Sequence, residues 1–339
     1  MEIGLDMWKP EDNDYFLDLG AKWTKTPVTC PAGDTDNGDV ALVKAAANAG
    51  LSVIVDLRPS QEVHHRLLGL VAARDTEATD ECIRHMSEEA ADVVRVADGA
   101  AVAYEFWGEF DCPYVGGFYK TDAVYVRYLP RIYEAIKSVD PNAEVWNGGY
   151  GVNLQPEFMH AIAEHAAECF DRANWHHYNI THYWPMGPDG EPAFDTPLEE
   201  CVQYTADKYR HMFTATRERM ASFGAEQPYV SSEWGMPTVM DEAVEGLKAY
   251  GLHNFVFQDG IYGLGDTEAA AYLDAWLAVF EEQGFTHLIY HRLRDNEAKG
   301  MDHDGTFWGV YCGLLYANYT PKAAMYETVK RWIRKGAQP

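Results

Sequence analysis

The stretch Ser52-Val53-Ile54-Val55-Asp56-Leu57 is a short run of apolar, mostly β-branched residues that ends at Arg58-Pro59. Its composition predicts a buried β-strand. Residues 38–49, just before it, have the spacing of an amphipathic helix and stop at Gly50. Residues 76–96, after it, are rich in Ala and Glu and predict a second, longer helix. Helix, strand and helix in this order indicate parallel strands joined by crossover helices.

The same alternation continues along the whole chain. Further short apolar runs predict strands at residues 3–8, 22–26, 102–107, 144–147, 174–178, 229–232 and 287–291. Further helices are expected at residues 124–138, 156–169, 198–223 and 322–335, with one or two between 241 and 283 that are broken by glycines at 260–265. Eight strand–helix units in 339 residues are about 40 residues each, which suits a (β/α)8 barrel. We therefore predict an α/β fold, a single-domain TIM barrel over residues 1–339. An open doubly wound sheet usually has a glycine-rich phosphate loop after its first strand, and residues 9–13 contain none.

Composition excludes several classes of protein. The chain has 27 basic and 53 acidic residues and a net charge of −26, which disfavours nucleic acids and anionic membranes as partners. Its six cysteines lack zinc-binding spacing, so we expect free thiols in a reducing compartment. No signal peptide or transmembrane run is apparent. These features predict a cytoplasmic protein, or a secreted one if a leader was removed, and they are compatible with a homo-oligomer.

Aromatic residues make up 13% of the chain, and several tryptophans fall at or just beyond predicted strand ends. Sugar rings pack their C–H faces on such side chains. We expect Trp8, Trp107, Trp184 and Trp234 to bind substrate in this way. The alternative is that these rings fill the core.

Two glutamates follow predicted strands at the end where barrel enzymes carry their active sites. Glu109 closes the run that begins at Tyr104, and Glu233 closes Tyr229-Val230-Ser231-Ser232. A carboxylate beside a buried strand is costly unless it is paired or functional. Glycoside cleavage needs two carboxyl groups that flank the scissile bond. Each glutamate taken alone could instead be a strand-end ion-pair partner.

Four motifs, in order, resemble those of clan A glycoside hydrolases. They are Tyr104-Glu105-Phe106-Trp107-Gly108-Glu109, Trp175-His176-His177-Tyr178, Ser231-Ser232-Glu233-Trp234-Gly235, and the tail from Gly313-Leu314-Leu315 to Thr320-Pro321-Lys322. The first is most similar to the β-xylosidase and α-iduronidase type. The resemblance implies a retaining glycosidase acting on oligosaccharides or polysaccharides, with Glu109 as acid/base and Glu233 as nucleophile. It further implies that Tyr178 forms a hydrogen bond with Glu233 and that His176 lines the sugar subsite near the acid/base. No cofactor or metal is expected.

The sequence departs from this clan at two places. The clan has Asn, which bonds the sugar 2-hydroxyl, where this chain has Gly108; we expect Asn147 to replace that donor. The clan often ends its eighth strand with Trp, where this chain has Tyr290-His291, and His291 is expected to contact substrate. Nearby cationic side chains could form a positively charged pocket for a uronic or sulfated sugar. The alternative, which we favour, is a structural ion-pair network with Asp6, Asp56, Glu105 and Asp295. These cations are Lys22, Lys25, Arg58, Arg292 and Arg294.

Two other functions remain open from the sequence. A metal-dependent barrel of the sugar isomerase type could use Glu109, Asp56, His177, Glu233 and His291 as ligands. A glycan-binding barrel without catalysis would explain the loss of the clan's asparagine at Gly108.

Overall fold

The structure is a computed structural model, and it describes residues 1–30, 38–108, 122–149, 156–177, 183–188, 190, 192–242, 244–245, 255–256, 262–295 and 311–337. Glu109 and Tyr178 lie outside these residues, as does the side chain of His177. None of the helices in this part of the chain has the length and apolar composition that a membrane span requires.

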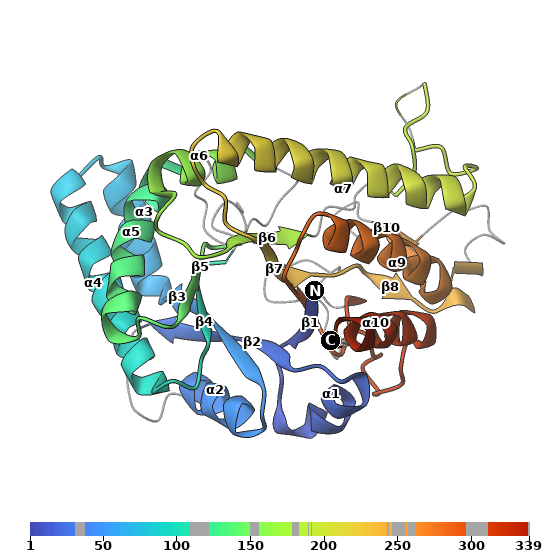
Figure 1. Cartoon of the computed structure of the whole chain (residues 1–339), viewed down its shortest axis with the longest axis horizontal. Helices are drawn as coiled ribbons and strands as arrows, with labels where there is room; N and C mark the ends of the chain where they lie inside the picture. The colour runs from blue at the N-terminus through green and yellow to red at the C-terminus, as the bar shows by residue number, and fades with distance from the viewer. Residues whose placement is uncertain are drawn as a thin grey trace.

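Eight parallel strands form the central sheet (Figure 1). Their order is β5-β4-β3-β2-β1-β11-β7-β6. Barrel strands that follow one another along the chain are therefore adjacent in the sheet. The strands are β1 (Glu2–Asp6), β2 (Trp23–Cys30), β3 (Ser52–Pro59), β4 (Ala103–Phe106), β5 (Glu144–Trp146), β6 (Ala173–His177), β7 (Tyr229–Trp234) and β11 (His287–Tyr290).

The barrel closes between β5 and β6 through a sparse seam. A single parallel bridge joins Trp146 to Arg172 in the described residues, and the Asp171 amide donates to the Val145 carbonyl at 2.7 Å. Beyond it, two asparagine side chains replace the backbone ladder. Asn174 donates its backbone N–H to Asn147 Oδ1 at 2.8 Å, and Asn147 Nδ2 donates to the Asn174 carbonyl at 3.1 Å.

Helices surround the sheet (Figure 1). They are α1 (Asn13–Leu19), α2 (Gly38–Asn48), α3 (Gln61–Ala72), α4 (Thr76–Ala97), α5 (Asp122–Val139), α6 (Pro156–Ala166), α7 (Leu198–Ala221), α9 (Asp266–Glu282) and α10 (Ala323–Gly336). In α4, Asp75 caps the first turn by accepting from the Ala78 amide at 3.0 Å. Its apolar face, which includes Ile83, Met86, Ala90 and Val94, is buried. The predicted TIM barrel is confirmed.

Several elements differ from the predictions. The α1 and α3 helices were not expected, and for α3 the available signal was Ser60, whose Oγ accepts from the Val63 amide at the helix start. One or two helices were predicted between 241 and 283, with glycine-rich breaks at 260–265, and α9 is one of them. The small second sheet was not predicted; it consists of β8 (Thr238–Val239), just before this range, β9 (Phe255–Val256) and β10 (Tyr262–Gly265). The glycine-rich sequence before residue 266 disfavours a continuous helix, and α9 begins only at Asp266.

Inside the barrel, an apolar layer closes the amino end of the strands. It consists of Ile54, Ala103, Trp146, Val230 and Ile289, with Trp23 packed against it. Side chains alternate between the two faces of a strand, so the residues two positions further along point into the barrel above this layer. This alternation sets the position of the site.

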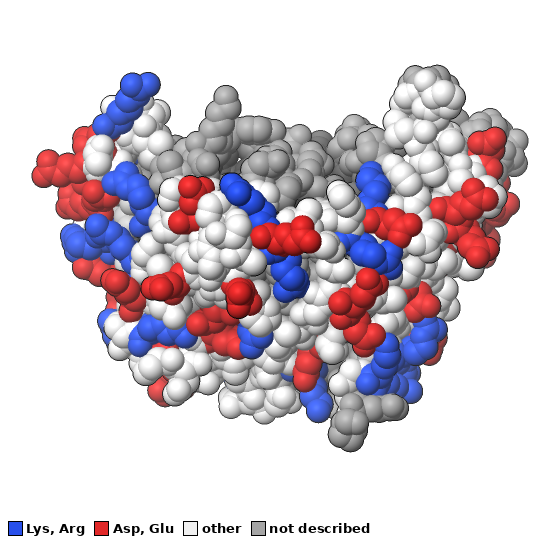
Figure 2. Space-filling view, turned by 45° about the horizontal axis from the view of Figure 1, so that its top comes forward, with Lys and Arg blue, Asp and Glu red and all other residues white. Residues whose placement is uncertain are grey.

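The exterior carries most of the charge. Figure 2 shows acidic and basic side chains interleaved over one face of the molecule. Exposed pairs such as Arg84 with Glu88 and Arg331 with Asp274 are typical of this surface. Surface pairs of this kind contribute little to stability, so the acidic excess concerns solubility more than the fold.

Candidate active site at the carboxyl ends of the strands

A polar layer lies directly above the apolar one. Two residues beyond Trp23, Ile54, Ala103, Val230 and Ile289, the inward positions carry polar groups, and all of these are buried. They are Lys25 on β2, Asp56 on β3, Glu105 on β4, Ser232 on β7 and His291 after β11, joined by Asp6 of β1 and His176 of β6. The carboxyl ends of barrel strands carry active sites, so this layer is the candidate site.

An irregularity in β7 brings Glu233 into the same layer. Trp175 pairs with Ser231 but His176 pairs with Glu233, so Ser232 is an extra residue in β7. Such a bulge redirects the side chains beside it. As a result, Ser232 reaches His176, with its Oγ 2.9 Å from Nε2, and the next residue, Glu233, also faces the barrel interior.

Glu233 is surrounded by positive and polar groups. Its Oε2 accepts a hydrogen bond from Lys25 Nζ at 2.6 Å, and its Oε1 lies 3.5 Å from His291 Nδ1. The side chain keeps 13% of its surface exposed, whereas that of Lys25 keeps 1%. Burial alone would raise the pKa of Glu233, but Lys25, His291 and His176 together hold it well below its ordinary value. Glu233 is therefore an ionised carboxylate that is still reachable from the barrel mouth.

Lys25 joins two carboxylates of the layer. Its Nζ lies 2.6 Å from Glu233 and 3.8 Å from Glu105. Burial would lower the pKa of this ammonium, but Glu233, Glu105, Asp6 and Asp56 raise it above the usual lysine value. Lys25 is therefore a permanently charged group in the centre of the site.

Glu105 and His176 form a second buried ion pair. His176 Nε2 lies 3.0 Å from Glu105 Oε1, which also accepts from the Gly149 amide at 2.9 Å. Burial would raise the pKa of Glu105, but Lys25 and His176 lower it to about 2. Burial would lower the pKa of His176, but Glu105 raises it to about 10. At neutral pH this pair consists of a carboxylate and an imidazolium.

Two glycines provide the space for the His176 ring. A Cβ at Gly149 would lie 2.0 Å from His176 Cδ2, and one at Gly108 would lie 3.1 Å from both His176 Cε1 and Glu105 Oε1. Gly108, where clan A enzymes have asparagine, thus lies next to His176 and Glu105, which already form an ion pair.

His291 links Asp6 to Arg292. Its Nδ1 lies 2.7 Å from Asp6 Oδ2, and its Nε2 lies 3.0 Å from an Arg292 guanidinium nitrogen. Guanidinium groups only donate hydrogen bonds, so Nε2 is the acceptor and Nδ1 carries the proton toward Asp6. This orients the Nδ1–H toward the carboxylates of Asp6 and Glu233.

The predicted ion-pair network is present in part. Arg58 Nε donates to Asp56 Oδ2 at 2.6 Å, and Lys25 approaches Glu105 as expected. Burial raises the pKa of Asp56 although Arg58 opposes this. The predicted partner Asp295 instead accepts from Lys322 at 2.9 Å.

Two expected substrate contacts are placed elsewhere. The prediction that Lys22 lies at the carboxyl end is wrong, because β2 begins at Trp23 and Lys22 precedes it, exposed at the amino end. Asn147 is fully buried, and its Nδ2 donates to the carbonyls of Gly148 and Asn174. Its side-chain amide therefore joins β5 to β6, which argues against a role as hydrogen-bond donor to a sugar.

The four tryptophans expected to bind sugar are buried. Trp8, Trp107 and Trp184 are 3–4% exposed and Trp234 is 1% exposed. Trp234 packs edge-on against Phe280 and Tyr290. Such burial leaves little ring surface for a sugar, so the packing favours the alternative that they fill the core.

The sequence identified Lys25 and Glu105 only as members of an ion-pair network. The contact between Lys25 and Glu233 depends on the bulge at Ser232, which has no sequence signal. The available signal for Lys25 was a lysine at an inward position of a strand that is otherwise uncharged.

Asp6, Glu233 and His291 also meet the geometric requirement for a metal site. Each offers one ligand atom, and these atoms lie within 4.8 Å of one another. However, a cation there would lie beside the Lys25 ammonium, 2.6 Å from Glu233. Lysine already provides the counter-charge of this carboxylate, so the donor set fits a metal poorly.

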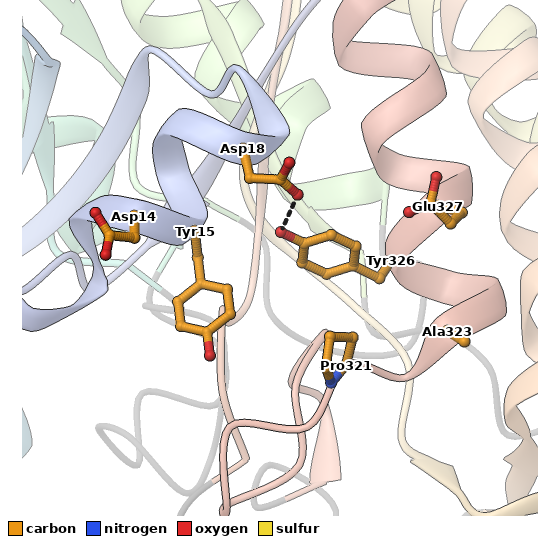
Figure 3. Close-up of a pocket in the computed structure, with 7 residues that line it drawn as sticks. All are labelled: Asp14, Tyr15, Asp18, Pro321, Ala323, Tyr326 and Glu327. Carbon is orange, nitrogen blue, oxygen red and sulfur yellow. Dashed lines mark hydrogen bonds between the residues drawn. The ribbon is translucent and has the colours of Figure 1, made fainter.

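A surface hollow of about 370 Å³ lies away from the strand ends, between α1 and α10 (Figure 3). One of its carboxylates, Asp18, already has partners: it accepts from Tyr326 at 2.9 Å and from Lys330 at 2.7 Å. Figure 3 shows the rings of Tyr15, from α1, and Tyr326, from α10, with Pro321 below Tyr326 in this view. None of the layer's charged residues lines it.

No protein-family model and no curated protein matches the sequence. Solved structures do match. A Ruminococcus gnavus β-glucuronidase in complex with D-glucuronic acid is 14% identical over 98% of this chain and 49% of its own, with a TM-score of 0.55. A Bacteroides uniformis β-glucuronidase bound covalently to a cyclophellitol-6-carboxylate aziridine is 12% identical over 98% and 35%, with a TM-score of 0.57.

The endo-1,4-β-D-mannanase of Thermotoga petrophila is 14% identical over 98% of this chain and 99% of its own, with a TM-score of 0.57. The chain thus spans the length of the mannanase but half or less of the two glucuronidases. At these identities the likeness shows the barrel fold, and all three of these neighbours are glycoside hydrolases.

Proposed function

We propose that this protein is a retaining glycoside hydrolase in which Glu233 is the nucleophile and Glu109 the general acid/base. The observation that carries the proposal is the environment of Glu233. It is an ionised carboxylate, partly accessible at the barrel mouth, with Lys25 bound to one oxygen at 2.6 Å. A nucleophilic carboxylate in a retaining glycosidase must be ionised and must face the anomeric carbon. The glycosidase neighbours and the clan A motifs agree with this role.

The decisive experiment is chemical rescue of a Glu233→Ala variant. Aryl glycosides are supplied with azide, and rescue that yields the glycosyl azide of inverted configuration identifies Glu233 as the nucleophile. For Glu109→Ala, azide is expected to give the azide of retained configuration. Glu144→Ala is the matched control, because Glu144 is a partly buried carboxylate paired with Arg172 at the amino end of β5. It is expected to keep wild-type turnover.

The substrate panel should pair each neutral glycoside with its uronide. Arg58 lies near the mouth with 44% of its side chain exposed, and two of the structural neighbours are β-glucuronidases. A much higher kcat/KM for one member of a pair would show whether the enzyme acts on neutral or on acidic sugars. Absence of cleavage across a broad panel, together with retained glycan binding, would support the non-catalytic barrel instead.

A metal-dependent barrel is the second candidate. Asp6, Glu233 and His291 converge, but Lys25 beside Glu233 makes this function the weaker of the two. Excess EDTA separates the two functions. The glycosidase is expected to keep its full rate after treatment and dialysis, whereas a metal enzyme would lose activity and regain it with a divalent cation.

A further inference from the structure

The contact between Lys25 and Glu233 affects which of the two steps of the proposed reaction is slower. This inference rests on the proposed function. Lys25 Nζ is 2.6 Å from the carboxylate oxygen Oε2. The ammonium is 1% exposed and is also held by Glu105 at 3.8 Å. Because Glu105 remains beside it, Lys25 stays in place and charged when Glu233 changes its charge.

The two steps change the charge of Glu233 in opposite directions. In the first, a Glu233 oxygen bonds to the anomeric carbon, the bond to the leaving oxygen breaks, and Glu109 gives that oxygen its proton. In the second, water bonds to the same carbon, the electron pair of the ester bond returns to Glu233, and Glu109 takes the proton from water. Glu233 is therefore neutral only in the covalent intermediate.

The ion pair exists in the free enzyme and is lost in the intermediate. A positive charge beside Oε2 stabilises the carboxylate and so makes it a weaker nucleophile in the first step. The same charge stabilises the carboxylate that forms as the ester bond breaks, so it makes Glu233 a better leaving group in the second step. Both effects disfavour accumulation of the intermediate.

We propose that Lys25 sets the rate-limiting step, so that formation of the glycosyl-enzyme, rather than its hydrolysis, limits turnover. Lys25 acts on a reacting carboxylate and not on the sugar. Its effect should therefore appear in the partition between the two steps more than in substrate binding.

The wild-type enzyme provides the first test. Stopped-flow assays with aryl glycosides of decreasing leaving-group pKa are expected to show no burst of phenol, and kcat is expected to rise with kcat/KM along the series. A burst of about one equivalent, with kcat independent of the leaving group, would overturn the inference but leave the glycosidase proposal standing. If no glycoside is cleaved at all, the proposed function itself fails.

A variant tests whether Lys25 causes this behaviour. Lys25→Met is expected to slow hydrolysis of the intermediate by roughly 100-fold, so that a burst appears and kcat no longer depends on the leaving group. Lys25→Arg, which keeps the charge, is expected to show no burst. Lys322→Met is the control for loss of a buried lysine, because Lys322 pairs with Asp295. Unchanged burst behaviour in folded Lys25→Met would contradict the proposal.

Discussion

Gly149 lies next to the ring of His176, so closely that a Cβ at Gly149 would lie 2.0 Å from the ring carbon Cδ2. Real Cβ atoms do not approach other atoms this closely. The ring cannot move away easily, because Glu105 and Ser232 both hold its Nε2. A glycine that follows β5 therefore fixes the position of a charged group on β6.

Replacing this glycine should disturb the site. Gly149→Ala is expected to destabilise the protein by about 1–3 kcal/mol through overpacking and to lower activity by displacing His176. Gly69→Ala is the control, since Gly69 lies in α3 with no atom within 4 Å of an added Cβ. It should be neutral or slightly stabilising. Thermal unfolding and kcat/KM check both variants; equal stability of the two would be inconsistent with the packing.

Introducing asparagine at position 108, where clan A enzymes carry it, should lower activity rather than raise it. Gly108→Asn introduces a side chain whose Cβ would lie 3.1 Å from both His176 and Glu105. Displacement of these groups by even 1 Å can cost about 100-fold in rate, so we expect kcat/KM to fall by that order. Gly108→Ala should show a smaller loss. A gain in kcat/KM from Gly108→Asn would show that the space is open to a 2-hydroxyl donor.

The ion pair of Glu105 and His176 should make stability depend on pH at both extremes. The pKa of His176 rises from 6.5 to about 10, so its contribution is complete below pH 6.5 and is lost as pH rises through 10. The pKa of Glu105 falls from 4.5 to about 2, so its contribution is complete above pH 4.5 and is lost as pH falls through 2.

Urea unfolding from pH 6.5 to 10 measures the first of these effects. Wild type should lose stability over this range, whereas His176→Gln should lose clearly less because its side chain does not titrate. Parallel curves for the two proteins would mean that His176 is not protonated in the folded state.

Removing one carboxylate from the layer should be costly. Glu105→Gln leaves Lys25 and His176 buried with one fewer negative partner, and breaking such pairs typically costs about 3–5 kcal/mol. The exposed pair of Arg84 and Glu88 serves as the comparison, and Glu88→Gln should have no measurable effect. Denaturant midpoints for the two variants give the difference directly. A Glu105→Gln protein as stable as wild type would imply that the layer is well hydrated.

The sequence predicted the barrel because local patterns carry that information. The run from Ser52 to Leu57 is a strand by composition alone, and β3 covers Ser52–Pro59. The small sheet of β8, β9 and β10 was missed because its described strands are two to four residues long, too short for a periodic signal.

The site was predicted less completely, for a physical reason. That Glu233 closes a strand is visible in the sequence, but its partner depends on a bulge that shifts β7 by one residue. Side-chain pairing between β2 and β7 is a long-range relation that no local pattern encodes. The contact of Asn147 was not predicted for the same reason, since its partner Asn174 is on the next strand.

The junction of β5 and β6 differs from the rest of the cylinder. One backbone bridge and the paired amides of Asn147 and Asn174 hold it in the described residues. Local unfolding begins where cooperative contacts are fewest. Transient opening of the barrel should therefore start between β5 and β6. Amide hydrogens of β5 and β6 should then exchange with solvent deuterium sooner than those of β2 and β3, whose eight-residue register is continuous.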